Sequence, residues 1–226
     1  MKKVLYKMVD LLEWIVAASF CAVLLMYVFH RVTPASQYAG EITDERNEQI
    51  KSVIVWRTNY LKKVETQIIY NLNMLPDSIL NSWLETDCHV LVYPQVKGSL
   101  DVAADAICED GYTIAYNDIT AKGGVIQNSD IYILGSPYII DKTLLHEMGH
   151  FVYYQYFGMD TSYVLPNSAS ESKRFIENER DGQEYYLLSD EYFAEMFAYT
   201  IRNGTSDEYK DTYVMDKIIQ NFCTKK

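Results

Sequence analysis

The N-terminal part of the chain contains one long apolar stretch, from residue 11 to residue 29, interrupted only by Glu13. As a helix, about 19 residues extend roughly 28 Å, which matches the hydrocarbon core of a bilayer. Lysines precede the stretch and acidic residues follow it, so the N-terminus is expected in the cytosol and the remaining chain outside. We therefore predict a membrane anchor or signal segment over 1–31, a linker over 32–43 and a folded domain over 44–226.

Helical spacing of apolar residues dominates the beginning of this domain. Over residues 44–75 the spacing predicts one long helix, or two helices with a break. The apolar positions are Ile50, Val53, Ile54, Trp56, Tyr60, Leu61, Val64, Ile68 and Ile69. Pro76 and Asp77 then begin a shorter helix that continues through Trp83 and Leu84.

Three short runs with the composition of β-strands follow, at 89–93, 112–116 and 131–134. The third run ends at Gly135, shortly before another helical segment. We expect it to be an edge strand with free backbone groups, which could pair with an extended peptide. An ordinary sheet edge has the same sequence pattern, so both interpretations stay open.

The helix that follows contains the sequence His146-Glu147-Met148-Gly149-His150. Its apolar face is formed by Leu144, Leu145, Met148, Phe151 and Val152. Asp141 is expected to cap the helix, and Gly149 to leave room beside the second histidine.

Two histidines four residues apart lie on the same face of a helix, so both imidazoles can bind one Zn²⁺ ion. Glu147 lies between them and is positioned to act on a water molecule at the metal. The alternative is a pair of solvated histidines with a surface glutamate. The apolar helix around the motif favours the zinc site.

A catalytic zinc site needs a third protein ligand. Glu191 and Glu195 share one face of a second apolar helix, which Ser189 is expected to cap. A carboxylate on such a helix is costly to bury without a partner, and zinc or a ligating histidine supplies one. Glu191 is therefore the first candidate for the third ligand. Other acids lie nearer to His150 in the sequence and are the alternatives: Glu171, Glu177 and Glu179.

Composition excludes one class of partner and leaves other questions open. The net charge of -11 and the isoelectric point of about 4.8 argue against a nucleic-acid partner, which requires a basic surface. The 20 tyrosines would suit a groove that holds a peptide, although ordinary packing is the better explanation for most of them. Cys88 and Cys108 can form a disulfide outside the cytosol, or remain free thiols.

The two motifs together resemble the catalytic domain of anthrax lethal factor and the secreted Pro-Pro endopeptidases. The likeness covers roughly residues 70–222. It implies an α+β, zincin-like metallopeptidase domain over 44–226, with a small mixed sheet and an active-site helix. It also implies Zn²⁺ as the cofactor, held by His146, His150 and Glu191, with Glu147 as the general base. Glu195 would lie behind the ligands.

The same family places a tyrosine shortly before the third ligand, where its hydroxyl stabilises the oxyanion. Tyr185 is the first candidate and Tyr186 the second, because the interval from Tyr185 to Glu191 is one residue shorter than in the family. Either tyrosine could instead be a packing residue.

The expected function is that of a zinc metalloendopeptidase that acts on peptide or protein substrates outside the cytosol, either anchored to the membrane or secreted. Two alternatives stay open. One is a catalytically inactive surface module that uses the same fold for binding, and the other is a zinc peptidase of a different lineage.

Overall fold

The computed structural model describes residues 36–94, 105–107, 113–115, 124–127, 130–157, 165 and 169–224. The predicted membrane segment, part of the predicted linker and Cys108 lie outside these residues. Within the described part, none of the helices is both long and apolar enough to cross a membrane. Residues Ser36–Lys226 form one compact unit.

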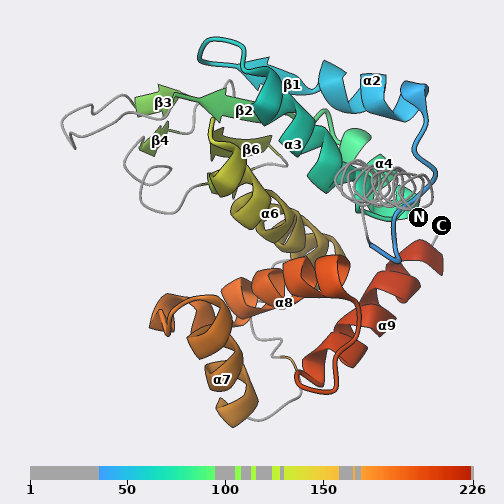
Figure 1. Cartoon of the computed structure of the whole chain (residues 1–226), viewed down its shortest axis with the longest axis vertical. Helices are drawn as coiled ribbons and strands as arrows, with labels where there is room; N and C mark the ends of the chain where they lie inside the picture. The colour runs from blue at the N-terminus through green and yellow to red at the C-terminus, as the bar shows by residue number, and fades with distance from the viewer. Residues whose placement is uncertain are drawn as a thin grey trace, which may run out of the picture. The chain divides into compact units, whose positions relative to one another are not determined.

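A four-stranded mixed sheet forms the first layer of this unit, in the strand order β1-β2-β6-β5 (Figure 1). Its strands are β1 Ile54–Trp56, β2 Val90–Tyr93, β5 Gly124–Gln127 and β6 Asp130–Leu134. Strands β1, β2 and β6 are parallel, whereas β5 runs antiparallel to β6, with Val125 opposite Tyr132. The predicted strands at 89–93 and 131–134 are thus confirmed, as is a small mixed sheet.

The prediction that residues 131–134 form an edge strand is wrong. β6 lies between β2 and β5, and both of its sides take part in the sheet. Ile131 and Ile133 are fully buried, as expected for an interior strand. Within the described residues, β5 is the last strand at this end of the sheet.

Of the two possibilities predicted over 44–75, the structure has two helices with a break, and the break contains a strand. Asp44–Ser52 forms α2, Ile54–Trp56 forms β1, and Lys62–Asn73 forms α3. Thr43 caps α2, because its side chain accepts a hydrogen bond from the Arg46 amide at 3.1 Å. Residues 53–56 are β-branched or aromatic, and parallel pairing with β2 overrides their helical periodicity.

A second, two-stranded antiparallel sheet comprises β3 Asp105–Ile107 and β4 Thr113–Ala115, which confirms the strand predicted at 112–116 in a shorter form. The short helix predicted after Pro76 is also confirmed, as α4 Asp77–Leu84.

The helix that carries the histidine motif, α6, extends over Pro137–Phe157. Proline suits the first position of a helix, because its missing N–H has no partner there in any case. Asp141 therefore lies inside the helix and does not cap it. Its Oδ1 instead accepts a hydrogen bond from Gln67 of α3 at 2.8 Å.

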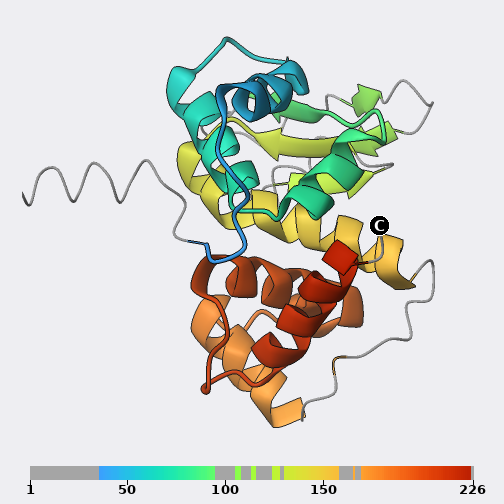
Figure 2. The same cartoon turned by 90° about the vertical axis from the view of Figure 1, so that its right-hand side faces the viewer.

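The C-terminal part consists of α7 Ala169–Glu179, the 3₁₀ helix η1 Glu184–Leu187, α8 Ser189–Asn203 and α9 Asp211–Thr224. Figure 2 shows α6, in yellow, crossing between the sheet with α3 on one side and α8 on the other. Fully buried side chains from these layers, including Ile68, Leu144 and Phe193, belong to one hydrophobic core. The metal-ligating candidates lie where α6 crosses α8.

Candidate metal centre

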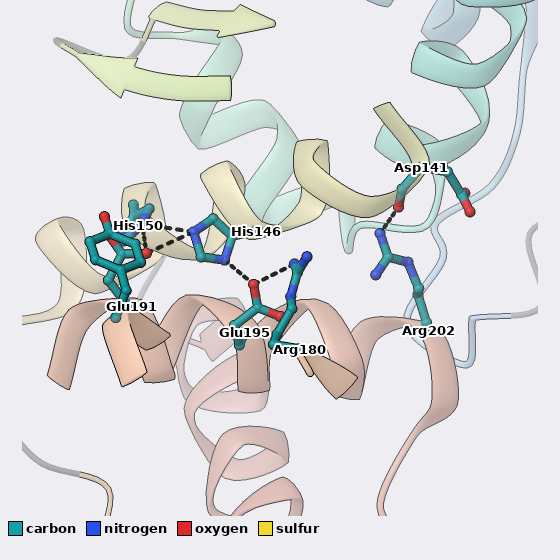
Figure 3. A network of polar contacts seen from close by, with 8 residues as sticks. Asp141, His146, His150, Arg180, Glu191, Glu195 and Arg202 are labelled. Atoms are coloured by element: carbon teal, nitrogen blue, oxygen red, sulfur yellow. Dashed lines mark hydrogen bonds and ion pairs between the residues drawn. The ribbon is translucent and has the colours of Figure 1, made fainter. Parts of the chain in front are cut away.

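His146 and His150 on α6 meet Glu191 on α8, and the structure brings all three side chains together (Figure 3). Their exposed fractions are 6%, 7% and 8%. Within the described residues, this is the group of histidine, cysteine and acidic side chains that could hold a metal ion, with ligand atoms all within 4.8 Å of one another.

The distances between the ligand atoms fit one small divalent cation. Nε2 of His146 lies 3.1 Å from Nε2 of His150 and 3.1 Å from Oε2 of Glu191. The distance from Nε2 of His150 to the same oxygen is 3.6 Å. Zinc bonds of about 2.0 to 2.1 Å at tetrahedral angles separate two ligand atoms by about 3.3 to 3.4 Å. The three residues can therefore hold a zinc-sized ion, with one position left for water or substrate.

Gly149 allows the two helices to approach closely enough to form this group. A Cβ atom at Gly149 would lie 2.7 Å from the Cα atom and 2.9 Å from the carbonyl oxygen of Ala194 on α8. Both are backbone atoms that cannot turn away. The glycine was predicted to make room beside His150, and the structure shows that the room is taken by the α8 backbone, next to Glu191 and Glu195.

Glu195 supports the first histidine from behind. Its Oε1 lies 2.6 Å from Nδ1 of His146, while Nε2 of the same ring is directed at the ligand group (Figure 3). A carboxylate in this position keeps the proton on Nδ1, which leaves Nε2 available as a ligand. Arg180 pairs with the same Glu195 oxygen. No sequence motif indicated Arg180.

The carboxylates of Glu191 and Glu195 favour a positive charge between them. Burial lowers the pKa of His146, but hydrogen bonds to Glu191 and Glu195 outweigh it and raise that pKa to about 10. Burial raises the pKa of Glu191, yet its contacts with His146 and His150 hold that pKa well below its usual range. A proton and a metal cation therefore compete for Nε2 of His146.

The two candidate tyrosines lie on η1 and contact different parts of the centre. The hydroxyl of Tyr185 donates a hydrogen bond to Oε1 of Glu191, and 40% of the residue is exposed. Burial and this hydrogen bond raise the pKa of Tyr185, so it remains a donor at neutral pH. The ring of Tyr186 packs edge-on against the ring of His146, with centroids 5.9 Å apart. The structure thus brings the Tyr185 hydroxyl to the ligands and uses the Tyr186 ring for packing.

Glu147 is 4% exposed, and its carboxylate is within electrostatic reach of His146 and Tyr185. The other acids considered as third ligands lie elsewhere. Glu171 accepts a hydrogen bond from the Asp211 amide, and Glu177 and Glu179 are exposed on α7.

Ser189 does not cap α8 as expected. It is the first helical residue, Leu188 occupies the cap position, and its side chain makes no capping hydrogen bond. Asp190 and Glu191 in the first turn nevertheless suit the positive end of the helix dipole. Glu191 thus lies in the first turn of α8 without the predicted cap.

Cys88, for which a disulfide with Cys108 was considered, is a buried free thiol in the structure. Burial raises the pKa of this thiol to about 12, so it is not a reactive thiolate at neutral pH.

Neither a protein-family model nor a curated protein matches the sequence. Among solved structures, the Pro-Pro endopeptidase PPEP-2 from Paenibacillus alvei is similar, with a TM-score of 0.44 and 16% sequence identity. The match covers 78% of this chain and 98% of that chain. The chemistry assigned to this chain therefore rests on its own residues.

Proposed function

We propose that the chain is a zinc-dependent metalloendopeptidase. The observation that carries this proposal is the buried group of His146, His150 and Glu191, whose ligand atoms are 3.1 to 3.6 Å apart. Glu147 lies between the two histidines in the sequence. Its side chain is buried and does not belong to the ligand group. Three protein ligands beside a buried carboxylate suit hydrolysis better than structural zinc binding, which uses four protein ligands.

Glu147 and Tyr185, both near the ligands, have roles in peptide hydrolysis. When bound, zinc supplies Lewis acidity that polarises a carbonyl group and lowers the pKa of water. Glu147 accepts the proton of the attacking water and returns it to the leaving amine. Tyr185 keeps its own proton and would turn from Glu191 to donate its one hydrogen bond to the oxyanion that develops on the scissile carbonyl.

An extended peptide segment is the substrate shape that suits this fold. β5 is the last strand at its end of the sheet within the described residues, and it packs against α6. A peptide that adds to the outer side of β5 would pair through backbone hydrogen bonds and run beside the helix that carries the histidines. Such pairing accepts many sequences, so side-chain preference comes from the surrounding residues.

The N-terminal sequence supports a place of action outside the cytosol. Lysines before the apolar stretch at 11–29 and acidic residues after it support a domain that is exported and held at the outer side of the membrane. The substrates are then peptides or proteins outside the cytosol.

Cleavage profiling of the full-length chain tests the proposal. The purified chain is incubated with a diverse peptide library, with and without a zinc chelator, and the products are identified by mass spectrometry. We expect internal peptide bonds to be cut, the chelator to abolish cleavage, and added zinc to restore it. A zinc-loaded chain that binds peptides without cutting any of them would instead identify an inactive binding module.

A further inference from the structure

We propose that Arg180 is a positioning residue that holds the ligand His146 and the tyrosine-bearing helix η1 in one arrangement. The proposal rests on the proposed function, because it assigns His146 to the metal and Tyr185 to the oxyanion. Its own basis is the set of contacts made by the Arg180 side chain and backbone.

The first contact lies behind the metal ligands. Arg180 Nη2 pairs with Glu195 Oε1, the oxygen that lies 2.6 Å from Nδ1 of His146. The side chains of Arg180 and Glu195 are 17% and 5% exposed, so little water competes for this pair. His146 and Arg180 approach the Glu195 carboxylate from different sides (Figure 3). Arg180 thereby fixes the carboxylate that orients the histidine ring.

The second contact is with η1. The Arg180 guanidinium carbon lies 4.9 Å from the centre of the Tyr186 ring, in cation–π geometry. That ring meets His146 edge-on and also packs against the Tyr185 ring, with centroids 5.3 Å apart. One guanidinium therefore contacts both the support of a metal ligand and the neighbour of the oxyanion tyrosine.

Backbone hydrogen bonds of Arg180 connect the end of α7 with the start of η1. The Arg180 amide donates to the Ile176 carbonyl at the end of α7, and its carbonyl accepts from the Gln183 amide at the start of η1. Asp181 and Gly182 between them have φ angles of 53° and 71°, in the left-handed region. This turn ends α7 and allows η1 to fold back toward α8.

A cavity of about 200 Å³ adjoins the pair, lined in part by Arg180, Glu195, Tyr199 and Arg202. It borders both partners of the ion pair. Shortening the Arg180 side chain would enlarge this space beside the Glu195 carboxylate. A free guanidinium ion, which has the shape and charge of the missing group, could then enter.

Zinc affinity of full-length variants, measured by competition with a chromophoric chelator, is the first test. Arg180→Met keeps the apolar length but loses the charge, and we expect zinc to bind about 10- to 100-fold more weakly. Arg180→Lys should fall between this variant and the wild type, because an ammonium group cannot reproduce the planar contacts. Lys173→Met on the exposed part of α7 is the matched control and should bind zinc normally.

Peptide cleavage at saturating zinc is the second measurement. Because the Tyr185 side of the site is also disturbed, Arg180→Met should lower kcat with little change in KM. Should the wild type cleave no peptide, the proposed function fails, while the zinc affinities still decide whether Arg180 positions His146.

Chemical rescue separates positioning from a general loss of stability. Millimolar guanidinium chloride, far below denaturing concentrations, should restore zinc affinity to Arg180→Ala but leave the wild type and Lys173→Met unchanged. Urea at the same concentration is the control and should restore nothing. Zinc affinity of Arg180→Met within twofold of the wild type, or a loss in Arg180→Ala that guanidinium does not reverse, would overturn the proposal.

Discussion

At the scale of single residues, neighbours in the sequence divide the work of the centre. Glu191 directs one oxygen at the histidines and receives the Tyr185 hydroxyl on the other. Tyr186, the residue after Tyr185, contributes its ring to the packing around His146. The sequence could nominate both tyrosines, whereas the contact of each one depends on the 3₁₀ geometry of η1.

The roles of the two tyrosines can be tested by removing one oxygen atom from each. Tyr185→Phe should lower kcat at saturating zinc by roughly 10²- to 10³-fold, the usual effect of losing one oxyanion donor. Tyr186→Phe keeps the ring contact with His146 and serves as the control, with activity close to that of the wild type. Steady-state kinetics of both variants would refute the assignment if Tyr186→Phe were the impaired one.

Zinc binding should depend on pH because of His146. Its raised pKa, about 10, means that the imidazole of the metal-free protein is protonated on both nitrogens at neutral pH. Zinc must displace the second of these protons. Below that pKa, the apparent affinity should rise by about tenfold per pH unit for each proton released. Calorimetry at pH 7 in buffers of different ionisation enthalpy should give about one proton per zinc ion. An affinity that is independent of pH between 6 and 8 would contradict this description.

At the scale of helices and strands, the crossing of α6 and α8 decides where the ligands meet. The histidine spacing, the helix around it and the second helix with its acids could all be predicted, because local periodicity determines them. β1 and the interior position of β6 could not be, since they depend on partners distant in the sequence. The role of Arg180 could not be predicted either, because its contacts depend on the left-handed turn at Asp181 and Gly182.

The closeness of this crossing predicts the effect of a single methyl group. Gly149→Ala would place a Cβ against the Ala194 backbone, so α6 and α8 must separate and the ligand atoms move apart. We expect a loss of about 1 to 3 kcal/mol in the free energy of unfolding, together with weaker zinc binding. Gln155→Ala, at an exposed position of the same helix, is the control and should leave both unchanged. Normal zinc affinity in Gly149→Ala would show that the crossing tolerates more space than described.

At the scale of the whole molecule, the chain combines an apolar N-terminal stretch with an acidic domain, and its net charge is -11. We predict that the full-length chain partitions with membranes and that the domain from Ser36 onward faces outward. Fractionation, followed by protease treatment of intact cells, checks both points. Recovery in the cytosolic fraction, or a domain protected from external protease, would contradict the predicted topology.

We propose that one buried metal centre performs peptide hydrolysis with Glu147 as its base. The most direct measurement compares the wild type with Glu147→Gln for zinc content and for cleavage of the same peptide. We predict about one zinc ion per chain in both proteins, and a loss of nearly all turnover in the variant. Cleavage by zinc-loaded Glu147→Gln at the wild-type rate would contradict the claim.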